Sequence, residues 1–205
     1  MIHMKLFIPK YTDIYIPFHS SDTTTTTPQE PPVTTSVPKK LAPIQGYIST
    51  LHRCHLGPEK CFDGNKATMC KSQDEDAPWL AFEFQAQINV SSVIIYNPPE
   101  HGNRTANVEL WMTDILPAIG DTMFTGGHLI GNFTGPGKDG ETIPIETDLS
   151  KSGRYLLIQM DKRGLARSLR PLNLLDVEVF TGTSETGESL PNQLFILYKY
   201  EDCIH

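Results

Sequence analysis

Short segments in which apolar and polar residues alternate recur along the middle of the chain. The clearest are Trp79–Phe84, Val90–Tyr96 and Ala106–Met112. Alternation with a period of two is typical of a β-strand that buries one face, whereas helical patterns repeat every three to four residues. These segments therefore predict strands, and the lack of a long helical repeat predicts an all-β protein.

Further segments fit a strand pattern but are shorter or more apolar. They are Gln45–Ser49, Leu129–Phe133, Thr142–Ile145, Arg154–Met160 and Leu174–Phe180. Arg154–Met160 is nearly all apolar, as expected of a central strand covered on both faces. Many short strands separated by Gly- and Pro-rich turns indicate a β-sandwich or jelly roll.

Composition divides the 205 residues into three parts. Residues 23–38 are rich in Thr and Pro, which favours extended backbone that cannot bury a core. This stretch is either a simple linker or, in a secreted chain, an O-glycosylated stalk. We expect an extended N-terminal segment over 1–38, a sandwich over 39–183 and a tail over 184–205.

The two ends of the chain carry apolar residues outside the expected sandwich. Residues 1–22 contain short apolar runs, and Leu194–Tyr200 reads as one more strand. The start lacks the pattern of a signal peptide, so a leader has been removed, the chain is a fragment, or the chain is not secreted. No apolar run reaches the length of a membrane-spanning helix.

Charge and motifs exclude several classes of function. The formal net charge is -7, which argues against a general nucleic-acid binder, because such proteins need a basic surface. The sequence contains no Gly-x-Ser-x-Gly, no phosphate-binding Gly loop and no His-Glu-x-x-His. We therefore do not expect an enzyme.

Cysteines and glycosylation motifs point to a secreted glycoprotein. Cys54, Cys61, Cys70 and Cys203 form no Cys-x-x-Cys pair, so zinc is disfavoured, and their even number allows two disulfides of undetermined pairing. Asn-x-Ser/Thr motifs occur at the acceptor residues Asn89, Asn103 and Asn132.

The stretch from Cys61 to Cys70 reads as a tight polar loop. Its Asp63-Gly64-Asn65 is typical of a turn. Asp63, Asn65 and Thr68 also supply carboxylate, amide and hydroxyl oxygens, the ligands that Ca²⁺ prefers. The loop is therefore either a turn held by hydrogen bonds from Asp63 or a cation site.

Six short motifs occur in a fixed order along the chain. They are Gly57–Asn65, Thr68–Ser72, Ala77–Phe82, Ser92–Asn97, Gly153–Leu156 and Leu175–Phe180. Their order resembles one family, the discoidin or coagulation factor V/VIII type C domain, which belongs to the galactose-binding-like β-sandwiches together with fucose-binding lectins and many carbohydrate-binding modules. The resemblance covers about residues 40–181 and implies a jelly-roll β-sandwich.

The resemblance also implies a structural Ca²⁺ between the first loop and the final strand. Carried over, Asp63 and Thr68 give side-chain oxygens, and Lys60 and Asn65 give backbone carbonyls. Asp176 gives the last carboxylate, where the family usually has Glu, and Leu175 adds a carbonyl. Such a cation fastens a loop without taking part in catalysis.

The family's sugar site lies at the loop end of the sandwich, and the match there is partial. Arg104 stands where fucose-binding members place an Arg, but their other Arg falls near Asn97 and their His near Ser72. We therefore do not predict fucose. Glu100 and His101 lie in the same loop and either bind another sugar or are ordinary exposed residues. A glycan on Asn103 would crowd the site.

Taken together, the sequence predicts a non-catalytic, extracellular glycan-binding or adhesion module with a structural calcium site. Its partners would be glycans or glycoproteins. The alternative is a structural subunit that packs into an extracellular assembly through its tails. Binding to an acidic membrane through Arg163–Arg170 is less favoured than a solvated turn.

Overall fold

The structure is a computed structural model that describes residues 37–118, 124, 126–161 and 170–182. These residues all lie in Thr35–His205, the second of the two units into which the chain divides. The predictions for residues 1–22, for the Thr/Pro-rich stretch and for Leu194–Tyr200 concern residues outside the described ranges. In the part that is described, no helix has the length and apolar character needed to cross a membrane.

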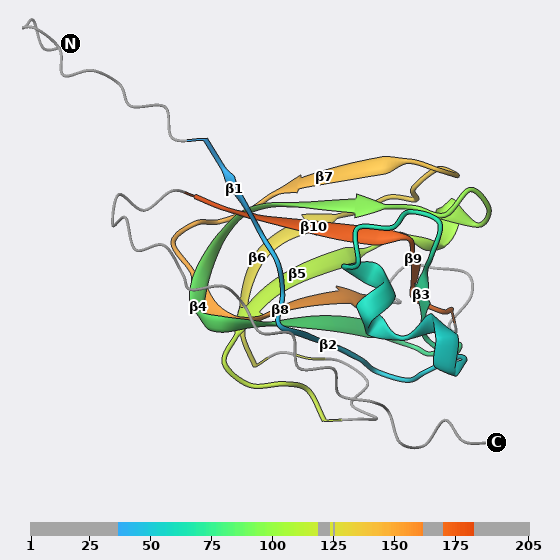
Figure 1. Cartoon of the computed structure of the whole chain (residues 1–205), viewed down its shortest axis with the longest axis horizontal. Coiled ribbons are helices and arrows are strands. Elements are labelled where there is room, and N and C mark those ends of the chain that lie inside the picture. Colours follow the sequence, from blue (N-terminus) through green and yellow to red (C-terminus); the bar gives the residue numbers. More distant parts are fainter. Residues whose placement is uncertain (1–36, 119–123, 125, 162–169, 183–205) are drawn as a thin grey trace, which may run out of the picture. The chain divides into compact units, whose positions relative to one another are not determined.

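Apart from a separate two-stranded sheet of β3 and β9, the strands form two antiparallel sheets, and one long strand belongs to both (Figure 1). β4 (Trp79–Tyr96) pairs through its first half with β2 (Gln45–Ile48) and β8 (Ser152–Met160). Its second half pairs with β7 (Thr142–Glu146) and β10 (Asp176–Thr181). The other elements are β1 (Lys39–Leu41), β3 (Cys70–Lys71), β5 (Val108–Thr113), β6 (His128–Phe133), β9 (Asn173–Leu174), and the 3-10 helices η1 (Cys54–Leu56), η2 (Pro58–Cys61) and η3 (Gly102–Arg104).

The continuity of β4 corrects the sequence analysis, which expected two separate strands there. Residues 85–87, between the two predicted strands, are exposed but keep the extended backbone. The ladder with β8 shifts register between Glu83 and Ile88, at the point where β4 leaves one sheet for the other. Polar residues therefore mark a bend here rather than the end of a strand.

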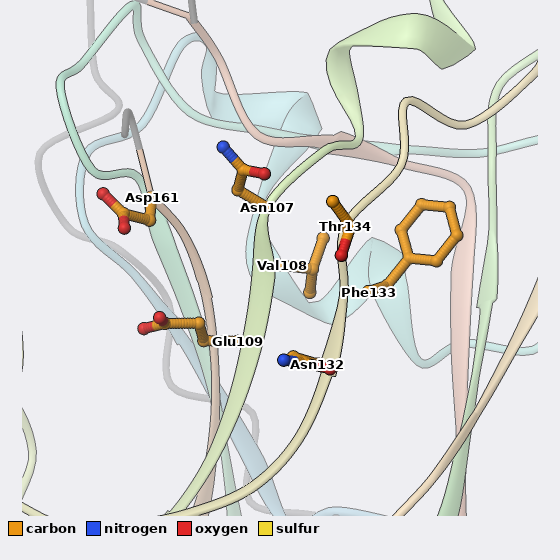
Figure 2. Close-up of a pocket in the computed structure, with 7 residues that line it drawn as sticks. All are labelled: Asn107, Val108, Glu109, Asn132, Phe133, Thr134 and Asp161. Carbon is orange, nitrogen blue, oxygen red and sulfur yellow. The ribbon is translucent and has the colours of Figure 1, made fainter. Parts of the chain in front are cut away.

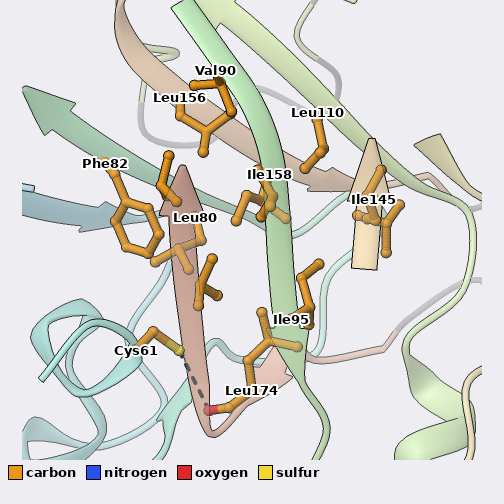
Figure 3. Close-up of a cluster of buried hydrophobic side chains, with 14 of the residues drawn as sticks. Cys61, Leu80, Phe82, Val90, Ile95, Leu110, Ile145, Leu156, Ile158 and Leu174 are labelled. Atoms are coloured by element: carbon orange, nitrogen blue, oxygen red, sulfur yellow. Dashed lines mark hydrogen bonds between the residues drawn. The ribbon is translucent and has the colours of Figure 1, made fainter. Parts of the chain in front are cut away.

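The core lies between the two sheets (Figure 3). Leu110 of β5 and Leu156 and Ile158 of β8 are fully buried there, and each such side chain contributes roughly 1.5–3 kcal/mol by leaving water. A second cluster, made of Trp79, Ala81, Phe124 and Leu157, covers the opposite face of β8. β8 is therefore buried on both faces, as its apolar sequence predicted.

One end of the sandwich collects the loops that carry the expected sites. β8 ends there and β5, β7 and β10 begin there, and β4 both begins and ends there because it bends from one sheet to the other. Backbone bonds join the loops: Asn107 N–H donates to Thr134 O at 2.9 Å, and Asp161 N–H donates to Asn107 O at 2.9 Å. We call this region the loop end.

Candidate functional site

The polar loop between Cys61 and Cys70 is organised around the carboxylate of Asp63. Asn65 N–H donates to Asp63 Oδ1 at 2.8 Å, and Thr68 Oγ1 donates to Asp63 Oδ2 at 3.0 Å and to Asn65 O at 2.8 Å. Gly64 allows the turn because its φ is +72°. The loop therefore brings together the side-chain and carbonyl oxygens that the sequence analysis assigned to a cation.

Asp176 lies at the start of β10 and is 1% exposed. Neither of its carboxylate oxygens has a hydrogen-bond partner of ordinary geometry. Burial raises the pKa of Asp176, and the carboxylates of Glu178 and Asp63 add to this, whereas the backbone N–H of Val177 and the charge of Lys40 lower it. A buried carboxylate without a partner is costly, which indicates that a positive group belongs beside it.

The two remaining residues of the predicted calcium site, Lys60 and Leu175, directly precede the polar loop and β10. Lys60 is in η2, and its Nζ is 3.9 Å from Asp63 Oδ2. Leu175 precedes Asp176 and donates its N–H to Tyr96 O at 2.9 Å. These residues supply two carboxylates and several neutral oxygens, which are the ligand types that a hard cation prefers. Among the described residues, no group of three or more His, Cys, Asp and Glu side chains is arranged for a metal.

Ser72 and Asn97, two residues of the predicted sugar site, are buried and make hydrogen bonds within the fold. Ser72 is fully buried, and its Oγ donates to Gln73 O at 2.7 Å and accepts from Leu172 N–H at 2.9 Å. Asn97 is 1% exposed, and its Nδ2 donates to Gly102 O at 3.2 Å and to Lys138 O at 3.1 Å. Their side chains therefore fix the loop end from beneath.

The other predicted residues lie on the surface of the same loop. Glu100 and His101 are exposed, and Arg104 is half-buried at the end of η3. His101 adopts left-handed backbone with a φ of 67°. Within the described residues, Arg104 has no hydrogen bond or ion pair from its guanidinium. The structure thus brings an arginine, a carboxylate and an imidazole into one short surface loop.

A pocket of about 190 Å³ opens beside this loop, and the sequence analysis did not anticipate it. Figure 2 shows its side chains, which come from the start of β5, the end of β6 and the residue after β8. The Phe133 ring packs against the core. Most of the other side chains that line the pocket are polar. The lining residues are Asn107, Val108, Glu109, Asn132, Phe133, Thr134 and Asp161.

Two features of the sequence relate to this pocket, but they can be interpreted only once the pairing of β5 with β6 is known. Glu109 and Asn132 occupy the polar positions of alternating strands, and the register places them directly opposite each other. Asn107 has a φ of 50°, a conformation that Asn tolerates better than most residues. Without the pairing of β5 with β6, these residues read as ordinary surface positions.

All three glycosylation acceptors are exposed, in different surroundings. Asn89 Nδ2 donates to Leu149 O at 2.8 Å and to Lys151 O at 3.2 Å. Asn103 lies in η3 next to Arg104. Asn132 lines the pocket together with the rest of its motif, Phe133 and Thr134. Glycosylation at each remains a prediction.

The Arg163–Arg170 stretch is described only at its last residue. Arg170 is 8% exposed, and its Nη2 donates to Ala106 O at 2.6 Å and to Asp161 O at 2.7 Å. Burial lowers the pKa of Arg170. This arginine therefore ties the loop end together and is not part of a membrane-facing basic surface.

The fold is shared with known lectins and carbohydrate-binding modules. No family model matches the sequence, and no curated protein is similar to it. The F-type lectin (fucolectin) from striped bass, Morone saxatilis, has a TM-score of 0.54 at 19% identity, over 71% of this chain and 49% of that chain. This chain thus spans about half the length of that lectin.

Two further structures cover most of a shorter domain. The lectin domain of Lectinolysin, complexed with Lewis B antigen, has a TM-score of 0.51 at 19% identity, over 68% of this chain and 93% of that chain. The CBM32 of AlyQ, in complex with 4,5-unsaturated mannuronic acid, has a TM-score of 0.51 at 11% identity, over 69% and 98%. These likenesses show a galactose-binding-like β-sandwich.

Proposed function

We propose that this chain is a glycan-binding module that uses its loop end to hold sugar hydroxyls without making or breaking a bond. The observation that carries the proposal is the loop of Glu100, His101 and Arg104. Its polar groups are accessible, and the backbone beneath it is fixed by Asn97. A fixed backbone lowers the entropy lost on binding.

The pocket extends this surface along the same end of the sandwich. Its amides, carboxylates and hydroxyl suit the many donors and acceptors of a sugar. Its volume of about 190 Å³ is below the range of roughly 300–1,000 Å³ typical of sites for drug-sized ligands. We therefore expect it to take a single sugar unit while Arg104 contacts a neighbouring unit.

A glycan array with unglycosylated protein tests this function. We expect binding that Arg104→Ala weakens by roughly 10-fold, because a charge-assisted hydrogen bond contributes about 1.5–3 kcal/mol. The matched control is Lys151→Ala, which removes a cation just before β8, at the opposite end of the strand from the loop end. Equal losses in both variants, or no glycan bound by the parent protein, would count against the proposal.

We also propose that the polar loop holds a structural Ca²⁺ with Asp63, Thr68 and Asp176 as side-chain ligands and carbonyls of Lys60, Asn65 and Leu175. The buried carboxylate of Asp176 supports this, because neither of its oxygens has a hydrogen-bond partner of ordinary geometry. The cation would supply positive charge that fastens the loop to β10. Titration calorimetry with Ca²⁺ should detect one site that is lost in Asp63→Asn.

We further propose that the chain works outside the cell. The Cys61–Cys70 disulfide supports an oxidising compartment, as does the exposure of the three glycosylation acceptors. Expression in a secreting host, followed by mass mapping of Asn89, Asn103 and Asn132, tests this. A secreted product with all three asparagines unmodified would argue against the glycoprotein assignment, whereas a glycan on Asn103 or Asn132 would crowd the proposed sugar site and argue against sugar binding there.

A further inference from the structure

The proposed cation site is divided between two segments that lie far apart in the sequence. Asp63 and Thr68 belong to the polar loop, whereas Asp176 begins β10. A cation binds tightly only where such ligands are already held together, since it otherwise has to order the loop itself. The structure holds the two segments together through residues that are not proposed as ligands.

The Cys61–Cys70 disulfide is the first of these connections. It closes the base of the polar loop, and both cysteines are fully buried. Cys70 pairs with Leu174 between β3 and β9, and Cys61 Sγ lies 3.4 Å from the Leu174 carbonyl oxygen (Figure 3). A disulfide sulfur has no proton, so this is a packing contact. Leu174 ends β9, two residues before Asp176, so the disulfide contacts the short strand that directly precedes β10.

A ring contact is the second connection. Lys66 Nζ lies 3.5 Å from the centroid of the Tyr96 ring, which attaches the outer part of the polar loop to β4. Tyr96 pairs with Asp176 in the ladder between β4 and β10. The loop is thus fixed at its base by the disulfide and at its outer turn by this cation–π contact.

We propose that the Cys61–Cys70 disulfide controls the cation site: oxidised, it holds the polar loop against the Asp176 segment, and reduced, it releases the loop and weakens Ca²⁺ binding. This inference rests on the proposed calcium site. The reductant is a dithiol, which gives two electrons and two protons. The protein disulfide becomes two thiols, and the dithiol becomes a cyclic disulfide. By linkage, bound Ca²⁺ makes this disulfide harder to reduce.

The first test compares Ca²⁺ affinity in two forms of the full chain. Titration calorimetry on the parent protein and on Cys61→Ser/Cys70→Ser should show affinity that is weaker by on the order of 10-fold in the variant, because the loop regains freedom. Lys66→Met should weaken binding by about threefold, and Lys66→Arg should restore it, because Arg also binds aromatic faces. A purely structural disulfide would lower thermal stability without changing Ca²⁺ affinity.

The second test needs no cysteine variant and so does not depend on its folding. The intact protein is treated with a dithiol, its free thiols are labelled, and the labelled cysteines are identified by peptide mass. Ca²⁺ at 100 times its Kd should slow labelling of Cys61 and Cys70 by up to about 100-fold. Labelling of Cys54 is the internal control, because Cys54 is exposed, disulfide-bonded and outside the polar loop.

The possible outcomes distinguish a failure of the redox coupling from a failure of the proposed calcium site. If the oxidised parent binds no Ca²⁺, the proposed calcium site is wrong. If Ca²⁺ binds equally to the parent and the double variant, or leaves labelling of Cys61 and Cys70 unchanged, the calcium site stands and the redox coupling is wrong. Weaker binding in the variant together with Ca²⁺-dependent protection supports the coupling.

Discussion

At the scale of single residues, Asp176 is the side chain whose surroundings explain its role best. It is 1% exposed and its oxygens have no hydrogen-bond partner of ordinary geometry, so without a cation the charged form costs stability. Its pKa is raised in the folded protein by burial. When the pKa of a carboxyl group is higher in the folded than in the unfolded protein, the free energy of unfolding is lowered at pH values above the unfolded pKa. This free energy is regained as the pH falls through the folded pKa, because the folded protein then takes up the proton.

Replacing Asp176 by Asn should therefore have opposite effects with and without calcium. In chelator at pH 7, Asp176→Asn should raise the free energy of unfolding by about 1–2 kcal/mol, because it removes a buried unpartnered charge. With Ca²⁺, the parent should gain stability and the variant should not. Urea denaturation under both conditions measures this. A variant that is less stable than the parent in chelator would show that Asp176 is satisfied without a cation.

The sequence indicates which residues carry oxygens suited to a cation or a sugar but not which of their side chains are accessible. Asp63, Thr68 and Asp176 stand on the expected segments because the motif order fixes the strands that carry them. Ser72 and Asn97 were expected near a ligand, yet both are buried and bonded to backbone carbonyls. Burial of a polar side chain depends on loops that pack from elsewhere in the chain, so a local pattern does not show it.

At the scale of elements, the loop end depends on the packing of one loop against another. Gly102 N–H donates to Asp139 Oδ1 at 2.7 Å, and Gly137 N–H donates to Thr105 O at 2.8 Å. A Cβ on Gly102 would lie 2.1 Å from Lys138 O, so only glycine permits this approach. The loop that carries Arg104 therefore keeps its position only while Gly102 fits against residue 138.

Gly102→Ala should disrupt the packing of the loop that carries Arg104 against the loop that contains Lys138 and Asp139. We expect a loss of about 2 kcal/mol or more in the free energy of unfolding, because the clash is with backbone that cannot rotate away. Glycan binding should fall as well, since Arg104 ends the same 3-10 helix. The matched control is Asn103→Ala at the exposed neighbouring position, which should leave stability unchanged. Equal stability of both variants would show that the loops are not coupled.

Element boundaries show where sequence patterns succeed and where they stop. The strands predicted at Leu129–Phe133 and Thr142–Ile145 match β6 and β7 to within a residue, because alternation and turn residues agree there. The short strands β1 and β3 were missed, and the single strand predicted over Leu174–Phe180 is divided into β9 and β10. β1, β3 and β9 span two or three residues, too few to show a period, and they exist because a distant strand supplies hydrogen bonds.

At the scale of the whole described domain, the fold follows from alternation and the order of motifs, whereas the long β4 does not. Exposed residues at its middle look like a loop in sequence, and only the pairing of its halves with β8 and β10 shows one strand in two sheets. That strand links the two sheets, and β10 begins with Asp176. A cation held between the polar loop and β10 should thus stabilise the domain as a unit.

This linkage gives a prediction for thermal unfolding of the full chain. A ligand that binds only the folded state adds about 2.7 kcal/mol when present at 100 times its Kd. For a domain of this size that corresponds to a rise in Tm of roughly 5–10 °C. Calorimetric scans in chelator and in increasing Ca²⁺ measure the rise, and Asp63→Asn should abolish it. Mg²⁺ should give a smaller rise, since it dehydrates reluctantly and needs a tighter octahedral site. The same rise in Asp63→Asn would place the cation elsewhere, because a site without the Asp63 carboxylate retains only one of its two charges.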